Sequence, residues 1–152
     1  MCSNYDQWPP IEDWIRALFP NLPPDQYQET SEQTCDYNCI AFAAEDEENW
    51  WWPSEDSFWP VEIVDDSLAS FEHAFRVARN YEPCQDGQFE AGFQKVAVYS
   101  AGNRVKHMAR QIDNGLWASK LGMGWDISHQ TTGSLICPKY GDSISYLRRP
   151  LP

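Results

Sequence analysis

The sequence is poor in positive charge and has no long apolar run. It contains 11 Lys and Arg against 23 Asp and Glu, which gives a formal net charge of −12. Nucleic-acid binding and attraction to anionic membranes both need basic patches, and a membrane-spanning helix needs about 20 apolar residues in a row. We therefore expect no nucleic-acid partner and no membrane partner, and a basic or neutral partner fits better than an acidic one. The opening "MCSNYDQWPP" lacks the positive and apolar regions of a signal peptide.

The cysteines do not suggest a disulfide framework or a metal site. There are five, an odd number, at irregular spacings, which predicts reduced thiols in a cytoplasmic protein. Cys35 and Cys39 form a C-x3-C pair that His107, His129 or Cys137 could complete as a zinc site. Structural zinc sites usually draw on two such pairs, so we expect no metal and no cofactor.

What the chain does have is apolar and aromatic residues for a core. The hydrophobic content is 42% and there are eight Trp, and a length of 152 residues fits one domain. Residues 1–34 predict an amphipathic helix, carried by the spacing of Ile11, Trp14, Ile15 and Leu18, followed by a polar connector.

The remaining residues change from helical to strand periodicity along the chain. A short helix is expected from Cys39, with Asn38 as its N-cap, and a longer one over 65–80, capped by Ser67 or Asp66. Strands are expected at 93–100, 104–112 and 116–122, with a closing strand at 143–150. This order predicts an α+β fold, in which N-terminal helices pack on an antiparallel β-meander.

Cys39 is the strongest candidate for chemistry. A cysteine in the first turn of a helix is favoured as a thiolate, and a histidine nearby can serve as its base. Of the three histidines, His73 falls on the solvent side of its predicted helix, whereas His107 lies within a strand and His129 follows the meander. A buried cysteine with no catalytic role is the common alternative.

Several sequence blocks resemble a bacterial family. The blocks "YNCIAFA", "WWWP", "HMAR", "SKLG" and "DISH" are similar to its N-C-I-A-(W/F)-A, W-W-W-P, H-x-A-R, S-K-L-G and D-I-x-H motifs. The order of cysteine, histidine and polar strand resembles, more broadly, the papain-like (NlpC-type) cysteine hydrolases. The resemblance implies a papain-like core over residues 35–149, and the bacterial family brings no established activity with it.

On this resemblance the protein is expected to be a hydrolase or acyl transferase that acts on an amide bond, as a cysteine protease (thiol protease), amidase or deamidase, with a peptide or protein substrate. Cys39 would be the nucleophile and His107 the general base. The Cys39 N–H and the side chain of Gln33, six residues upstream, would bind the oxyanion.

The group that orients His107 depends on the strand register. A three-residue loop pairs Ala109 with Ser119 and places Ser119 on the His107 face, whereas a two-residue loop presents Lys120. Ser119 is the better partner for an imidazole. Three further residues are orienting candidates: Gln111, Asp126 and His129.

The tryptophans allow two interpretations. Trp51, Trp52 and Trp117 could bind substrate, or the "WWWP" stretch could wall the helix that carries Cys39. In a second functional class, the chain would be a non-catalytic protein-binding module, with a degenerate papain-like fold and a Trp-rich surface. The sequence leaves the oligomeric state open.

Overall fold

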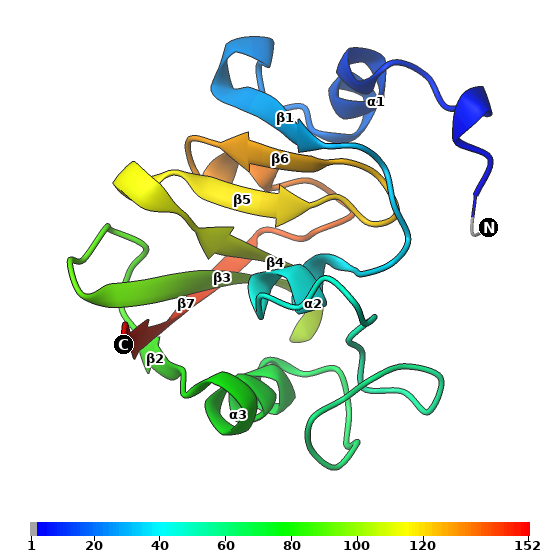
Figure 1. The fold of residues 1–152 in the computed structure, drawn as a ribbon. Helices are drawn as coiled ribbons and strands as arrows, with labels where there is room; N and C mark the ends of the chain where they lie inside the picture. Colours follow the sequence, from blue (N-terminus) through cyan, green and yellow to red (C-terminus); the bar gives the residue numbers. More distant parts are fainter. Residues whose placement is uncertain (1–2) are drawn as a thin grey trace.

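A seven-stranded antiparallel sheet with three α-helices forms the structure, a computed structural model that describes residues 3–152 (Figure 1). The sheet order is β1-β6-β5-β4-β3-β7-β2. Residues 1 and 2, where the stretch examined for a signal peptide begins, lie outside the described residues. The strands are β1 (Tyr27–Ser31), β2 (Glu82–Cys84), β3 (Phe93–Ala101), β4 (Arg104–Gln111), β5 (Trp117–Lys120), β6 (Asp126–His129) and β7 (Ser143–Pro150). The helices are α1 (Ile11–Leu18), α2 (Cys39–Ala43) and α3 (Leu68–Arg79), with short 3-10 turns η1 (Tyr5–Gln7), η2 (Pro24–Gln26), η3 (Asp113–Gly115) and η4 (Gly133–Leu135).

The predicted helices are confirmed, but α2 is shorter than its alanines and acids suggest. Ser67 caps α3 by accepting the Ser70 N–H, as expected. α2 begins after Asn38 and ends at Ala43 instead of continuing through the acidic run. The side chain of Asp46 accepts the N–H groups at positions 48 and 49, and such local bonds compete with helix continuation.

The central hairpins follow the predicted loops. Gly102 and Asn103 both have positive φ between β3 and β4, as a two-residue hairpin turn requires. The "DNG" loop joins β4 to β5, with Gln111 opposite Trp117 and Arg110 opposite Ala118. This is the three-residue-loop register, and it turns Ser119 toward the His107 face.

Three strands, β1, β2 and β6, were not predicted. β1 lies in the stretch expected to be a polar connector, and β6 in a stretch expected to be a loop. β1 is an edge strand whose central residues are exposed, so it carries little of the apolar alternation by which strands are recognised. β7 is confirmed as a strand, but it pairs with β3 and β2, so the sheet is not a simple meander.

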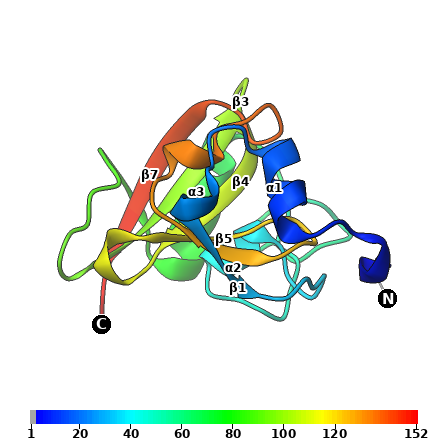
Figure 2. The same cartoon turned by 90° about the horizontal axis from the view of Figure 1, so that it is seen from above.

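The sheet is buried on both faces. Along β3, Val96 and Val98 pack with α2 and α3, whereas Ala97 and Tyr99 pack with α1, because successive side chains alternate between faces. Figure 1 and Figure 2 both show α1 beside the β1–β6 end of the sheet, and the C-terminus on the side away from η1. Within residues 3–152, the helices are too short and too polar to cross a bilayer.

Candidate active site

Cys39 is the first residue of α2 and is 9% exposed. The start of this helix is tied to the "WWWP" stretch through Asn38. The Asn38 Oδ1 atom accepts the N–H groups of Ala41 at 3.1 Å and Trp51 at 3.0 Å, and its Nδ2 donates to the Trp51 carbonyl at 2.7 Å. The predicted N-cap therefore also fixes the position of the cysteine.

The groups around the Cys39 sulfur have opposite effects on the pKa of its thiol. Burial raises the pKa of the thiol to about 11. Acting against burial, the N–H groups of Met108, Ile40 and Cys39 itself donate to the sulfur, and the positive charge of Lys120 also lowers the pKa. Because burial dominates, the thiol is neutral at pH 7 in this conformation.

A buried lysine lies beside Cys39. The Lys120 Nζ atom donates to the carbonyls of Thr34, at 2.7 Å, and Gly124, and lies 4.0 Å from the Asp126 Oδ1. The Tyr37 hydroxyl donates to the Asp126 Oδ2 at 2.5 Å, and its ring lies under the ammonium group at 5.2 Å. We call Lys120, Asp126 and Tyr37 the lysine cluster. Burial lowers the pKa of Lys120 to about 8, against the opposing effect of Asp126.

His107 is fully buried on β4, on the other face of the sheet. Its Nε2 lies 3.0 Å from the Ser119 Oγ, and within residues 3–152 its Nδ1 has no hydrogen-bond partner. The ring stacks on Tyr140, with 4.1 Å between centroids and 4° between planes. Burial, and then the charge of His129, holds the pKa of His107 well below its usual value.

Ser119 connects His107 to a second histidine. Its Oγ lies 2.8 Å from the His129 Nε2, and the His129 Nδ1 lies 2.9 Å from the Thr131 carbonyl oxygen. Burial lowers the pKa of His129 to about 4. We call His107, Ser119 and His129 the histidine chain. The predicted contact of Ser119 with His107 is confirmed, and His129 reaches His107 through it.

Cys39 and His107 approach the same stretch of β4 without a hydrogen bond between them. The Cys39 sulfur accepts the N–H of Met108, which follows His107 in the chain. On the other side, Tyr140 stacks on His107, and the negative charge of a Cys39 thiolate raises the pKa of Tyr140 beyond the effect of burial.

The other predicted polar residues have different partners. The Gln33 side chain, expected to bind the oxyanion, makes no hydrogen bond within residues 3–152. Gln111 shares the His107 face but donates to the Gly87 carbonyl at 2.8 Å. Asp126 binds Tyr37, not His107. Among residues 3–152, neither Gln111 nor Asp126 makes a hydrogen bond to His107, so their role as orienting groups stays a prediction.

The predicted substrate-binding tryptophans lie mostly in the core. Trp51 is 1% exposed and Trp117 is also buried, so neither forms a surface for substrate in this conformation. Trp52 is half-buried and packs edge-on against Phe71 at 5.4 Å. In this stretch Trp50, with 36% of its surface exposed, is the tryptophan that reaches solvent. The interpretation of "WWWP" as a wall for α2 is confirmed for Trp51.

The cysteines differ in state. Cys35 is disulfide-bonded, whereas Cys39, Cys84 and Cys137 carry free thiols. The expectation of reduced thiols is therefore wrong for Cys35, which cannot join Cys39 on a metal in this state. Over residues 3–152, no three His, Cys, Asp or Glu side chains are placed to share a metal ion.

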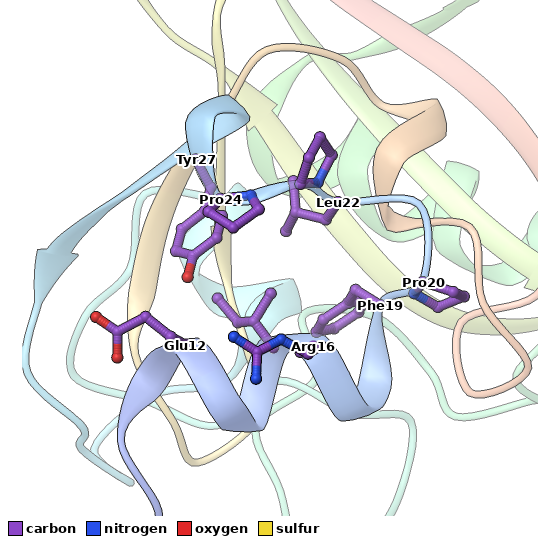
Figure 3. Close-up of a pocket in the computed structure, with 9 residues that line it drawn as sticks. Glu12, Arg16, Phe19, Pro20, Leu22, Pro24 and Tyr27 are labelled. Atoms are coloured by element: carbon purple, nitrogen blue, oxygen red, sulfur yellow. The ribbon is translucent and has the colours of Figure 1, made fainter.

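A surface cavity lies away from these residues. It has a volume of about 180 Å³ and lies between α1 and the Pro-containing connector to β1. Figure 3 shows Glu12 and Arg16 of α1, with Phe19 and Tyr27, around it. No predicted site residue lines this cavity.

Two neighbours of the site were missed by sequence reasoning. Lys120 was considered as a partner for His107, but it lies beside Cys39. Tyr140 comes from the loop "PKYGD", which carries no periodic pattern, and its stacking on His107 depends on chain segments more than 30 residues apart. Only the alternation of β5, which sends Ser119 and Lys120 to opposite faces, could have indicated the position of Lys120.

Comparison with known proteins places the chain in a family. Neither the curated proteins nor the solved structures contain a match. A family model matches residues 28–148 and spans α2, the central strands and the histidine chain. The chain belongs to the family described as "Domain of unknown function (DUF7689)".

Proposed function

We propose that the protein is a cysteine-dependent hydrolase or acyl transferase that acts on an amide bond, with a papain-like core. Cys39 is the nucleophile and His107 the general base. One observation carries the proposal: the buried His107 ring is held through Nε2 by Ser119, while its Nδ1 has no hydrogen-bond partner among residues 3–152. The next N–H along β4, that of Met108, donates to the Cys39 sulfur.

The proposed chemistry requires Cys39 and His107 to come within hydrogen-bond distance of each other when substrate binds. The Cys39 thiol gives its proton to the His107 Nδ1 as the sulfur attacks the carbonyl carbon of an amide, which forms a tetrahedral oxyanion. The intermediate then breaks its C–N bond, and His107 returns the proton to the leaving amine. Water or an acceptor amine resolves the thioester on Cys39, which gives hydrolysis or transfer respectively.

The buried state of Cys39 determines when the proton moves. Because burial raises the pKa of the thiol to about 11 and His107 is neutral, the two side chains do not form an ion pair beforehand. Proton transfer therefore accompanies attack on the substrate, and the substrate must gain access to a sulfur that is 9% exposed.

Acyl transfer from p-nitrophenyl acetate tests the proposal. We expect rapid acetylation of Cys39, located by peptide mass spectrometry after acid quenching, and loss of this label in Cys39→Ala. His107→Ala should slow acetylation on the order of 100-fold, the lower end of general-base effects. Cys137→Ala is the matched control, since Cys137 is also buried. Equal acetylation of Cys84 and Cys39, or no effect of His107→Ala, would contradict the proposal.

A second candidate is a protein-binding module with a degenerate papain-like fold. It is favoured by the burial of Cys39 and His107 and by the exposed apolar side chains of Trp50, Phe58 and Ile63. In that case Cys39→Ala would leave the protein's interactions unchanged, and the acetylation experiment would show no preference for Cys39.

A further inference from the structure

We propose that His129, acting through Ser119, is a positioning residue that fixes which nitrogen of His107 carries the proton. The histidine chain then has one direction of hydrogen bonding, and its two histidines are opposite tautomers. The tautomer assignment stands on the hydrogen bonds between buried, neutral imidazoles, whereas its consequence for catalysis rests on the function proposed above.

The Thr131 carbonyl sets the donor and acceptor roles along the histidine chain. A carbonyl oxygen only accepts hydrogen bonds, so the His129 Nδ1, at 2.9 Å, must be the donor. The Ser134 hydroxyl donates to the same oxygen at 2.7 Å. A neutral imidazole carries one N–H, and the Nε2 of His129 is therefore an acceptor. Burial keeps His129 neutral near pH 7, with a pKa of about 4.

The direction then passes through Ser119. Its hydroxyl can donate one hydrogen bond, and the His129 Nε2 at 2.8 Å accepts it. The Ser119 oxygen can therefore only accept from the His107 Nε2 at 3.0 Å. His107 consequently carries its proton on Nε2 and a lone pair on Nδ1.

The surroundings of His107 agree with this assignment. Nδ1 is buried without a partner, and a buried acceptor left unpaired is less rare than a buried N–H left unpaired. Stacking of the ring on Tyr140 at 4.1 Å holds its plane. The histidine chain therefore leaves a lone pair, and not an N–H, on the His107 Nδ1, which is the form a general base needs.

NMR of protein labelled with ¹⁵N-histidine tests the tautomers directly at pH 7. We expect the Nε2–H form for His107, the Nδ1–H form for His129, and the averaged signals of a solvent-exposed ring for His73. His107→Gln and His129→Gln assign the signals. The Nδ1–H form at His107, or the same tautomer at both buried histidines, would overturn the proposal.

Two substitutions then test the role of His129. His129→Phe keeps a ring but removes the acceptor for the Ser119 hydroxyl, which can then donate to the His107 Nε2. We expect mixed tautomers at His107 and Cys39 acetylation that is slower by roughly 2- to 10-fold, less than in His107→Ala, because part of the population keeps a lone pair on Nδ1. His129→Gln, whose amide oxygen can accept, should restore part of both readouts, and His73→Phe should change neither.

The outcomes separate the two proposals. A shift of the His107 tautomer with no change in acetylation would support the positioning role of His129 but contradict the function assigned to Cys39. An unchanged His107 tautomer in folded His129→Phe would contradict the positioning role of His129, whatever the acetylation rate.

Discussion

The lysine cluster and the histidine chain are both buried and polar, and adjacent residues of β5 supply them. Lys120 faces Cys39, and Ser119 faces His107 on the opposite side of the sheet. The lysine cluster holds an ammonium group beside a carboxylate, whereas burial keeps both imidazoles of the histidine chain neutral near pH 7. The lysine cluster thus pairs two opposite charges, and the histidine chain holds two neutral imidazoles.

The lysine cluster should carry the largest energetic effect. Lys120→Met leaves Asp126 buried without its cation, and removal of one partner of a buried pair costs about 3–5 kcal/mol. Urea unfolding should show this loss. Lys106→Met, on the exposed side of β4, is the matched control and should change stability by less than about 0.5 kcal/mol. A similar loss in both variants would mean that the Lys120 pairing is not the cause.

The histidine chain should respond to acid instead. Because the folded pKa of His129 lies below the unfolded value of 6.5, its contribution is fully present above pH 6.5. As the pH falls from 6.5 toward about 4 the unfolded chain binds a proton that the fold does not, so stability is lost. The loss is on the order of 3 kcal/mol, and the lowered pKa of His107 adds in the same direction.

Unfolding free energies measured by urea at several pH values between 7.5 and 4.5 check this. His129→Gln should flatten the curve, whereas His73→Gln on the exposed face of α3 should follow the parent protein. A parallel slope in His129→Gln would show that other groups cause the acid sensitivity.

The hydrogen bonds of Asn38 that hold α2 in place should contribute more to the free energy of unfolding than the N-cap of α3. Asn38→Ala removes three hydrogen bonds, two of them to Trp51, and we expect a loss of about 2 kcal/mol. Ser67→Ala removes a cap on a longer helix near the surface and should cost about 1 kcal/mol. The same denaturation series measures both, and an equal or reversed order would contradict the role of Asn38 in holding Cys39.

The sequence predicted the elements with strong local signals. The N-cap Asn38, the helix that begins at Cys39, the "DNG" register and the approach of Ser119 to His107 all follow from short-range rules. The positions of Lys120 and Tyr140 do not, because they depend on contacts between distant segments. Gln111 and Asp126 were candidate orienting groups by residue type, and their hydrogen bonds to Gly87 and Tyr37 could not be read from the sequence because those partners lie far along the chain.

Relative alkylation of Cys39, Cys84 and Cys137 is the most direct test of the central claim. Cys84 is partly exposed and Cys39 is buried, so exposure alone predicts faster reaction of Cys84 with iodoacetamide. The account predicts that Cys39 reacts first at pH 7, that His107→Ala abolishes its advantage, and that Cys84 is unaffected by that change. If Cys84 reacts first and His107→Ala leaves the Cys39 rate unchanged, Cys39 and His107 do not act together.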